Sequence, residues 1–533
     1  MAGRWQVVLA MSVAALVGAA AFYPSLPNEF VYDDRPIIVN NALVTQPGAW
    51  YRFWQHPWWP RGESSDKLYR PLAAWTLRAN IVLAGRAEPN PYAFRLVNLG
   101  LHALAGAGVA LTAWRLIRHP AAAWIAGLLF AVHPIHTEAV VTGYGRAELL
   151  AGCLSAWLLA RYLRDPPAGR WAAMGFHLFN TLLFLGAAMS KEHALFVWPV
   201  LLLFDLWRRR EVPTESRVDR RTWVNQTLAP AHLCFILAVG LFMFLRYQVF
   251  GWNYVLDASR TVPWEDPMHH VGFIERLLTP FRLTFLAIEL LFRPGRLCPI
   301  WSITELLPAD RLAWDVVIGL SLWVAATAGA VLCWRRRSRM GLVFVGLMVT
   351  LAVPVHAMPM AHWLFAERWL YLPTVFMAIG LAAILVRLAR LAVPLTVAAV
   401  FLLLPASWQY GSAFADNLTM NREVVRRQPD NYQGRRNLAI VLYYQGRYTE
   451  AIQAAEEIIE RFIDPPVWSG RFGTPRTQYL VLLKSFLALG DGRRALVALD
   501  AYESLHLGTG EPSLTAEREQ ALALIAGEDA PAP

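Results

Sequence analysis

Charge is scarce in this chain of 533 residues: Asp, Glu, Lys and Arg make up 17% of it, whereas hydrophobic residues make up 56%. A soluble protein of this size would carry more charge and fewer long apolar runs, so a soluble globular fold is excluded. Cysteine is scarce as well, with four residues that show no paired spacing. The cysteines therefore suggest neither a disulfide framework nor a zinc site.

Apolar residues, in contrast, gather in about eleven runs long enough to cross or nearly cross a bilayer. Because backbone N–H and C=O groups in lipid must be satisfied within each segment, these runs are expected to be helices. We therefore predict an all-α, polytopic membrane protein. The predicted spans are 5–23, 96–114, 120–134, 139–160, 171–189, 194–207, 229–249, 311–333, 341–356, 369–388 and 391–408.

The positions of the arginines explain the formal net charge of +10. They cluster near residues 115–118, 161–170, 208–221, 335–339 and 387–390. If all five clusters are cytoplasmic, the segments between them alternate consistently across the membrane. Nucleic-acid binding is therefore a poor explanation of the charge. The same parity predicts a cytoplasmic amino terminus, a retained first span and a carboxyl-terminal region outside the cytoplasm.

The predicted membrane body, residues 1–409, has two long extracytoplasmic loops. They cover residues 24–95 and 250–310. Within the second loop, the apolar run 273–293 is interrupted by charged residues and a proline. We interpret this run as a re-entrant or interfacial helix.

Residues 410–526 have a different composition and are predicted to form a small helical region outside the cytoplasm. The order Leu438, Gly446, Ala451 and Ala455 resembles a tetratricopeptide repeat, with glycine at the turn and small residues where helices touch. A generic helical hairpin is the alternative. Residues 527–533 are predicted to be a disordered tail.

Groups able to carry chemistry fall at four turns on the extracytoplasmic side. Asp33 and Asp34 open the first loop, close to the membrane, where carboxylates cost free energy unless they pair, bind a metal or react. The other turns carry His133, His136, Glu138, Arg146 and Glu148; then Lys191, Glu192 and His193; then His356, His362, Glu367 and Arg368.

Each turn also has a structural explanation. The aspartate pair could cap a following helix. His133 and His136 could cap helix ends or, with Glu138, bind a divalent metal, although a structural zinc site would need four ligands. Lys191 with Glu192 could be an interfacial pair whose long side chains reach toward water, as could Glu367 with Arg368.

Six segments occur in order along the chain: FVYDDRPIIVNN, LYRPLAAWTLRAN, AFRLVNLGLHAL, HPIHTEAVVTGYGRAELLAG, SKEHALFVWPVLLLFD and AERWLYLP. Together they resemble the transmembrane and tetratricopeptide-repeat O-mannosyltransferase family, within the C-type glycosyltransferase superfamily. The resemblance covers residues 5–408, and the composition suits a high-GC bacterium. The chain carries far fewer repeats than the animal members, so the resemblance does not identify the acceptor.

The resemblance implies an integral membrane glycosyltransferase. It would transfer mannose or another hexose, with inversion, from a polyprenyl-phosphate donor to an acceptor hydroxyl, a protein Ser or Thr among the candidates. The reaction would take place on the outer face of a bacterial inner membrane. No cofactor is firmly implied, and a divalent cation is an open alternative.

The resemblance also implies roles for the residues at the four turns. Asp34 is the preferred general base, with Asp33 orienting the acceptor or tuning the pKa of its neighbour. Arg368 is the first candidate for the donor phosphate, followed by Lys191 and His362. The remaining residues would line the sugar and acceptor pocket: His133, His136, Glu138, Arg146, Glu148, Glu192 and Glu367.

Two other classes of function compete with this one. A non-catalytic scaffold could use the repeats to bind an envelope protein and the spans as an anchor, but an anchor needs only one span. A transporter would need charged residues at the bilayer midplane, whereas here they lie near the predicted span ends.

Overall fold

The computed structural model describes residues 2–48, 50–60, 68–85, 88–167, 169–211, 229–251, 268, 271–357, 364–462, 476–505 and 514–528. Within these ranges, helices are the only regular secondary structure. The chain divides into two compact units: residues 1–261, 272–297 and 309–415 form the first, and residues 262–271, 298–308 and 416–533 form the second. The all-α prediction is confirmed, and the change of unit at residue 415 lies close to the predicted boundary at 409.

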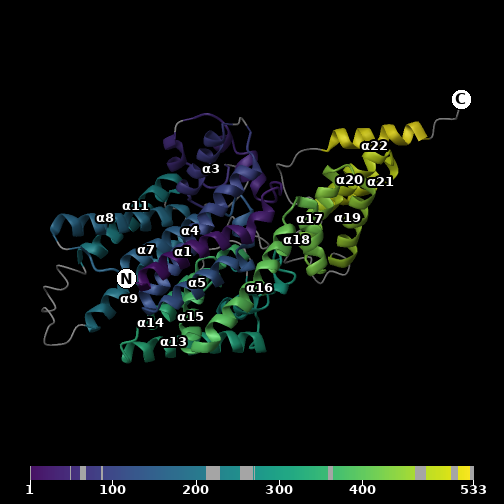
Figure 1. The fold of residues 1–533 in the computed structure, drawn as a ribbon. Coiled ribbons are helices and arrows are strands. Elements are labelled where there is room, and N and C mark those ends of the chain that lie inside the picture. Colours follow the sequence, from purple (N-terminus) through teal and green to yellow (C-terminus); the bar gives the residue numbers. More distant parts are fainter. Residues whose placement is uncertain are drawn as a thin grey trace. The chain divides into compact units, whose positions relative to one another are not determined.

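Helices of the first unit lie at all eleven predicted spans (Figure 1). The unit contains α1 (Ala2–Phe22), α2 (Ala42–Thr45), α3 (Pro71–Ala84), α4 (Pro91–Ile117), α5 (Pro120–Val132), α6 (Thr137–Val141), α7 (Arg146–Tyr162), α8 (Arg170–Ser190), α9 (Val197–Glu211), α11 (Ala229–Phe250), α12 (Phe273–Phe292), α13 (Trp314–Arg335), α14 (Gly341–Leu351), α15 (Pro373–Arg387) and α16 (Ala392–Ser412).

Six of the described helices are long and apolar enough to cross a membrane, and the bent pair α5–α6 could add a seventh. The six are α1, α4, α8, α11, α13 and α16. The protein is therefore a polytopic helical membrane protein. The count of eleven spans stays a prediction, as does the re-entrant placement of α12, which is a helix with Pro280 in its interior.

Small residues bring α1, α4 and α5 together in the centre of the body. Ala14, Ala110 and Gly127 meet there, and a Cβ on Gly127 would lie 2.9 Å from the Cβ atoms of both alanines. Close backbone approach through small residues is a common way for helices to pack in membranes. This central packing holds the turn that follows α5 in a fixed place.

The chain between α5 and α7 differs from the two predicted helices at 120–134 and 139–160. Helix α5 ends at Val132 because the residue before Pro134, His133, is extended, with ψ 124°. After the short α6, the chain turns at Gly143 and Gly145, and a Cβ on Gly145 would lie only 2.2 Å from the carbonyl oxygen of Ala139. The predicted span 139–160 is therefore interrupted by a turn at residues 142–145.

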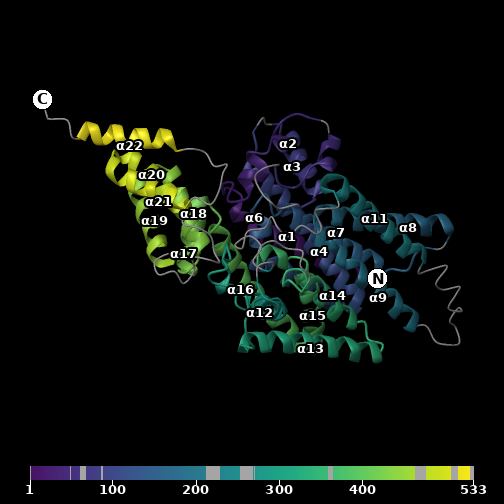
Figure 2. The same cartoon turned by 180° about the vertical axis from the view of Figure 1, so that it is seen from behind.

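Part of the first loop folds into a small subdomain of α2, α3 and short helical turns, visible beside each other in Figure 2. Its apolar core includes Ile37, Ile38, Phe53, Trp58 and Tyr144. The core therefore ties the chain that follows the aspartate pair to the turn that precedes α7.

The second unit contains α17 (Asn417–Arg427), α18 (Tyr432–Tyr444), α19 (Tyr448–Phe462), α20 (Arg476–Leu489), α21 (Gly492–Ser504) and α22 (Thr515–Glu528). Gly446 and Gly490 turn between successive helices at φ values of 74° and 79°, which glycine adopts without strain. Ala451 and Ala455 are buried, as the repeat pattern predicts. Helix α22 covers the first two residues of the predicted tail, and 529–533 lie outside the described residues.

Candidate active site

Asp34 is a fully buried carboxylate at the start of the first loop. Its Oδ1 accepts a hydrogen bond of 2.8 Å from the backbone N–H of Tyr144, and its Oδ2 accepts one of 3.2 Å from that of Val31. Asp33, one residue earlier, is only half-buried. The two adjacent acids therefore differ in exposure: Asp34 holds two chain segments together, whereas Asp33 keeps part of its surface exposed.

Gly143 lies so close to Asp34 that no other residue fits. A Cβ at this position would come within 2.3 Å of Ile38 Cδ1 and 2.9 Å of Asp34 Oδ1. We expect Gly143→Ala to lower the free energy of unfolding by about 1–3 kcal/mol, the usual cost of overpacking. Thermal unfolding of the purified protein in detergent measures this change.

The matched control is Gly100→Ala in α4, where an added Cβ meets no heavy atom within 4 Å. This variant should melt at or slightly above the parental temperature, since alanine favours helix. Equal melting of the two variants would show that the contact between Gly143 and Asp34 has no structural weight.

Burial raises the pKa of Asp34 from 3.8 to about 6, although the N–H donors and Arg95 oppose the shift. The folded protein therefore keeps the Asp34 proton up to about pH 6, whereas the unfolded chain loses it near pH 4. The contribution of Asp34 to the free energy of unfolding is thus fully present below about pH 4, and it is lost as the pH rises through 6. A shift of this size corresponds to about 3 kcal/mol.

Asp34→Asn should therefore show a different dependence of melting temperature on pH from the parent. Between about pH 4 and pH 7 the parent should lose stability relative to the variant, by about 3 kcal/mol in total. Other groups titrate in both proteins, so the difference between the two curves isolates Asp34. Parallel curves would contradict the raised pKa.

Arg368, in the short helical turn Glu367–Leu370, is a cation that also interacts with Tyr144. Its guanidinium forms an ion pair with Glu138, and its backbone N–H donates a 2.9 Å hydrogen bond to Glu138 Oε2. The Tyr144 hydroxyl also donates to Glu138, at 3.3 Å, and Arg368 Cζ lies 5.0 Å from the centre of the Tyr144 ring. We call Asp33, Asp34, Glu138, Tyr144 and Arg368 the acid–arginine cluster.

Burial and the neighbouring acids have opposite effects on the pKa of Arg368. Burial by itself would lower the pKa of the guanidinium, but Glu138, Tyr144 and Asp33 raise it, so the group stays charged. The Arg368 side chain keeps 16% of its surface exposed, against 3% for Glu138. Arg368 therefore presents a permanent positive charge within electrostatic reach of the half-buried Asp33.

A second charged group, the lysine cluster, consists of Arg70, Glu148, Lys191, Glu192 and His193. Lys191 forms an ion pair with Glu148, and His193 Nε2 lies 3.5 Å from the same carboxylate. Arg70 pairs with Glu192 at 3.1 Å. The lysine cluster lies near the acid–arginine cluster. The charge of Glu148 raises the pKa of Arg368, and the charge of Arg368 lowers the pKa of Lys191.

Burial lowers the pKa of Lys191 to about 8, with Arg70 adding to the effect and Glu148 opposing it. Burial would raise the pKa of Glu192, but Arg70 and Arg246 hold it at about 2. Lys191 is thus the cation in this cluster whose charge is least firmly held near neutral pH.

Three of the predicted pocket residues are buried inside the protein. Arg146 is fully buried and donates 2.9 Å hydrogen bonds to Asn80 Oδ1 and to the Phe94 carbonyl, which joins α7 to α3 and α4. His133 Nδ1 accepts from the N–H of Ile135 at 3.1 Å, so the capping alternative describes it correctly. These hydrogen bonds fix Arg146 and His133 within the fold, and their place in a substrate pocket stays a prediction.

His136 is the third. Its ring is fully buried, with centroids 4.5 Å from Phe130, 4.7 Å from Tyr371 and 5.3 Å from His102. Neither ring nitrogen has a hydrogen-bond partner among the described residues. No group of three or more His, Cys, Asp and Glu in the described ranges is arranged to hold a metal ion.

Two predicted residues, Glu367 and His362, lie near Arg368 in the sequence. Glu367 is buried and accepts a 2.8 Å hydrogen bond from the Tyr410 hydroxyl, which ties it to α16. His362 lies outside the described residues.

Sequence reasoning assigned no role to Tyr144, Arg95 or Arg70. Arg95 Nε donates a 2.8 Å hydrogen bond to the Val141 carbonyl, and its other nitrogens bond the carbonyls of Asn28 and Glu29. The guanidinium thus connects the start of the first loop to the turn before α7. All three residues lie within the segments quoted above, but nothing in the spacing of those segments indicates which ones meet.

Comparison with known proteins gives relatives over most of the chain. The chain is 30% identical over 483 residues to the Homo sapiens protein O-mannosyl-transferase TMTC1, covering 83% of this chain and 54% of that protein. It is 37% identical over 299 residues to Drosophila melanogaster protein O-mannosyl-transferase Tmtc2, covering 54% of this chain and 29% of the relative. The chain thus spans about half the length of the human relative, and it spans a smaller share of the mouse and fly relatives. No family model matches.

Two solved structures are distantly similar. Apo ArnT from Cupriavidus metallidurans has a TM-score of 0.40 at 13% identity, over 99% of this chain and 76% of that one. The apo oligosaccharyltransferase from Archaeoglobus fulgidus has a TM-score of 0.41 at 14% identity, over 81% of this chain and 59% of that one.

Proposed function

Because this chain is a homologue of the transmembrane and tetratricopeptide-repeat O-mannosyltransferases, we propose that it transfers a sugar from a polyprenyl-phosphate donor to an acceptor hydroxyl. The donor sugar is mannose or another hexose, and the acceptor is a protein Ser or Thr. One observation carries the proposal: the half-buried carboxylate of Asp33 lies within electrostatic reach of the charged Arg368.

The base in this reaction is Asp33 rather than Asp34. The raised pKa of Asp34 suits a base, but both of its oxygens accept backbone hydrogen bonds and none of its surface is exposed. A base must reach the proton that it removes. Asp34 instead positions Asp33, through its contacts with Tyr144 and Val31.

The step is a displacement at the anomeric carbon. The acceptor oxygen attacks from the face opposite the phosphate, its proton passes to the Asp33 carboxylate, and the bond between the sugar and the phosphate oxygen breaks. The lipid phosphate leaves with the electron pair, and the sugar is inverted. Arg368 stabilises the negative charge that develops on the phosphate. Lys191 adds a second positive charge nearby.

The fold supports a membrane location for this reaction. The lipid donor would enter from the bilayer beside the spanning helices, and both clusters lie at or near helix ends, with Glu138 in the first turn of α6 and Glu148 in the first turn of α7. We place these turns and the carboxyl-terminal helices outside the cytoplasm, in a bacterial inner membrane, on the parity of the arginine clusters. A scaffold would need neither buried ion pairs nor so many apolar helices.

The proposal is tested with purified full-length protein in lipid nanodiscs. The protein is incubated with polyprenyl-phosphate mannose, and separately with polyprenyl-phosphate glucose, together with Ser- and Thr-containing peptides. Mass spectrometry should detect a peptide that has gained one hexose, and free polyprenyl phosphate. If no donor is consumed with any hydroxyl acceptor, the protein is not a transferase of this class.

A further inference from the structure

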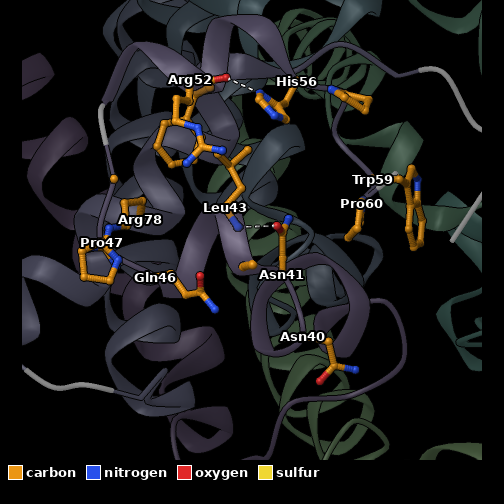
Figure 3. Close-up of a pocket in the computed structure, with 14 residues that line it drawn as sticks. Asn40, Asn41, Leu43, Gln46, Pro47, Arg52, His56, Trp59, Pro60 and Arg78 are labelled. Carbon is orange, nitrogen blue, oxygen red and sulfur yellow. Dashed lines mark hydrogen bonds between the residues drawn. The ribbon is translucent and has the colours of Figure 1, made fainter. Parts of the chain in front are cut away.

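The first-loop subdomain contains a cavity of about 330 Å³ that the proposed reaction does not use (Figure 3). None of the acid–arginine cluster lines it. Its walls come from the chain after Asp34, from α2, from the short helix Trp50–Gln55, from residues 57–60 and from α3. A volume of this size is at the lower end of the range for ligand sites.

The walls of the cavity are held by hydrogen bonds that do not depend on a ligand. Asn41 accepts from the N–H of Leu43 at 3.0 Å and donates to the Ile37 carbonyl at 3.1 Å. Arg78 donates to the carbonyls of Thr45, at 2.9 Å, and Val44. The cavity is therefore preformed, and it shares the apolar core that includes Tyr144.

The lining is rich in donors and in positive charge. It includes the side-chain amides of Asn40 and Gln46, the guanidinium of Arg52 and the indole of Trp59, and none of the lining residues that the structure describes is Asp or Glu. Arg52 is exposed. The Trp59 N–H is buried without a hydrogen-bond partner in the described part of the chain. A matching ligand must supply hydrogen-bond acceptors and negative charge.

We propose that this cavity binds an acidic peptide segment of the acceptor protein, next to the hydroxyl that receives the sugar. This proposal rests on the proposed function. Arg52 pairs with an acidic side chain, the two amides bond the peptide backbone, and the Trp59 N–H donates to a carbonyl. A neutral glycan would leave the charge of Arg52 without a partner, so it fits the described lining less well.

Geometry along the chain supports a link between the cavity and the base. Asn40 and Asn41 directly follow the five-residue helical turn Arg35–Val39, which begins after Asp34. Five residues would rise by about 8 Å in an α-helix, and this wider π-helical turn covers no more than that distance. About three residues of extended peptide cover that distance. A peptide with its acidic residue in the cavity can therefore present a Ser or Thr about three positions away to Asp33.

The test compares two fluorescent peptides that each contain one Thr. They differ at a single position, three residues from the Thr, which is Glu in one peptide and Gln in the other. Binding to the full-length protein is measured by anisotropy without donor, and transfer is measured with donor. The parent should bind the Glu peptide more tightly. Arg52→Glu should weaken that binding, and raise the KM for transfer, by about 10-fold. The kcat should not change.

Charge exchange and a matched control complete the experiment. Arg52→Glu should gain affinity for a peptide with Lys at the same position, which loss of folding could not produce. Arg336→Glu makes the same change of charge on an exposed arginine that does not line the cavity, and it should bind like the parent. Equal binding of the Glu peptide by the parent and Arg52→Glu overturns the proposal.

Two further outcomes separate the sources of failure. In the first, vesicles that contain phosphatidylglycerol displace the Glu peptide, their binding depends on Arg52, and the peptide does not support transfer. The cavity then binds lipid headgroups, and the proposal is wrong. If the peptide binds as expected but no donor is consumed, the cavity assignment stands and the proposed function fails.

Discussion

Asp33→Asn should lower the rate of sugar transfer by about 100- to 10,000-fold, the usual range for loss of a general base. The amide cannot take the proton of the acceptor hydroxyl, but it has almost the same shape as the carboxylate. Since Asp33 is only half-buried and the amide keeps the size of the side chain, the variant should melt close to the parental temperature. The rate is measured with purified protein in nanodiscs at saturating donor.

Asp34→Asn is the matched comparison, with the same chemical change one residue later. It should lose less transfer, about 10-fold, because its neighbour is displaced rather than removed. The large loss should therefore belong to Asp33. If Asp34→Asn were inactive while Asp33→Asn transferred sugar at the parental rate, the sequence-based preference for Asp34 as base would be right.

Arg368→Gln should have the second-largest effect, because it removes both a cation for the leaving phosphate and the partner of a buried carboxylate. Losing the phosphate contact should lower the transfer rate by about 100- to 1,000-fold. Leaving Glu138 buried without its ion pair should destabilise the protein by about 3–5 kcal/mol. The transfer rate and the melting temperature measure the two effects separately.

The double variant Arg368→Gln with Glu138→Gln distinguishes the two roles of Arg368. Neutralising Glu138 removes the unpaired buried charge, so the melting temperature should recover by most of the loss. Transfer should stay low, because the main cation for the leaving phosphate is missing and Lys191 alone supplies the remaining positive charge. Recovery of transfer together with stability would show that Arg368 only supports the structure.

The helices were predictable from the sequence because hydrophobic runs and their polar ends are local signals. The meeting of the first-loop acids with Glu138 and Arg368 was also predicted, from parity, since all of these groups fall at turns expected on one side of the membrane. Parity places residues on a side of the bilayer, however, and says nothing of which side chains touch. Arg70 pairs with Glu192, for example, and nothing in the sequence indicates that these two distant residues are in contact.

The sequence could not show how each predicted site residue is buried, for one physical reason. Arg146 and His136 are polar residues beside apolar spans, and sequence alone does not distinguish a buried structural group from one that faces substrate. In the structure, Arg146 donates to Asn80 and the Phe94 carbonyl, and the ring of His136 packs against aromatic rings. The difference between Asp33 and Asp34 likewise depends on Gly143, which lies more than a hundred positions away.

Mass spectrometry of envelope proteins from cells that carry the parental chain or its Asp33→Asn variant, at equal expression, examines the proposed chemistry in its natural setting. We expect a set of Ser- or Thr-containing peptides to carry one hexose in the parent and none in the variant. Identical glycosylation in the two strains would contradict both the transferase activity and the role of Asp33 in it.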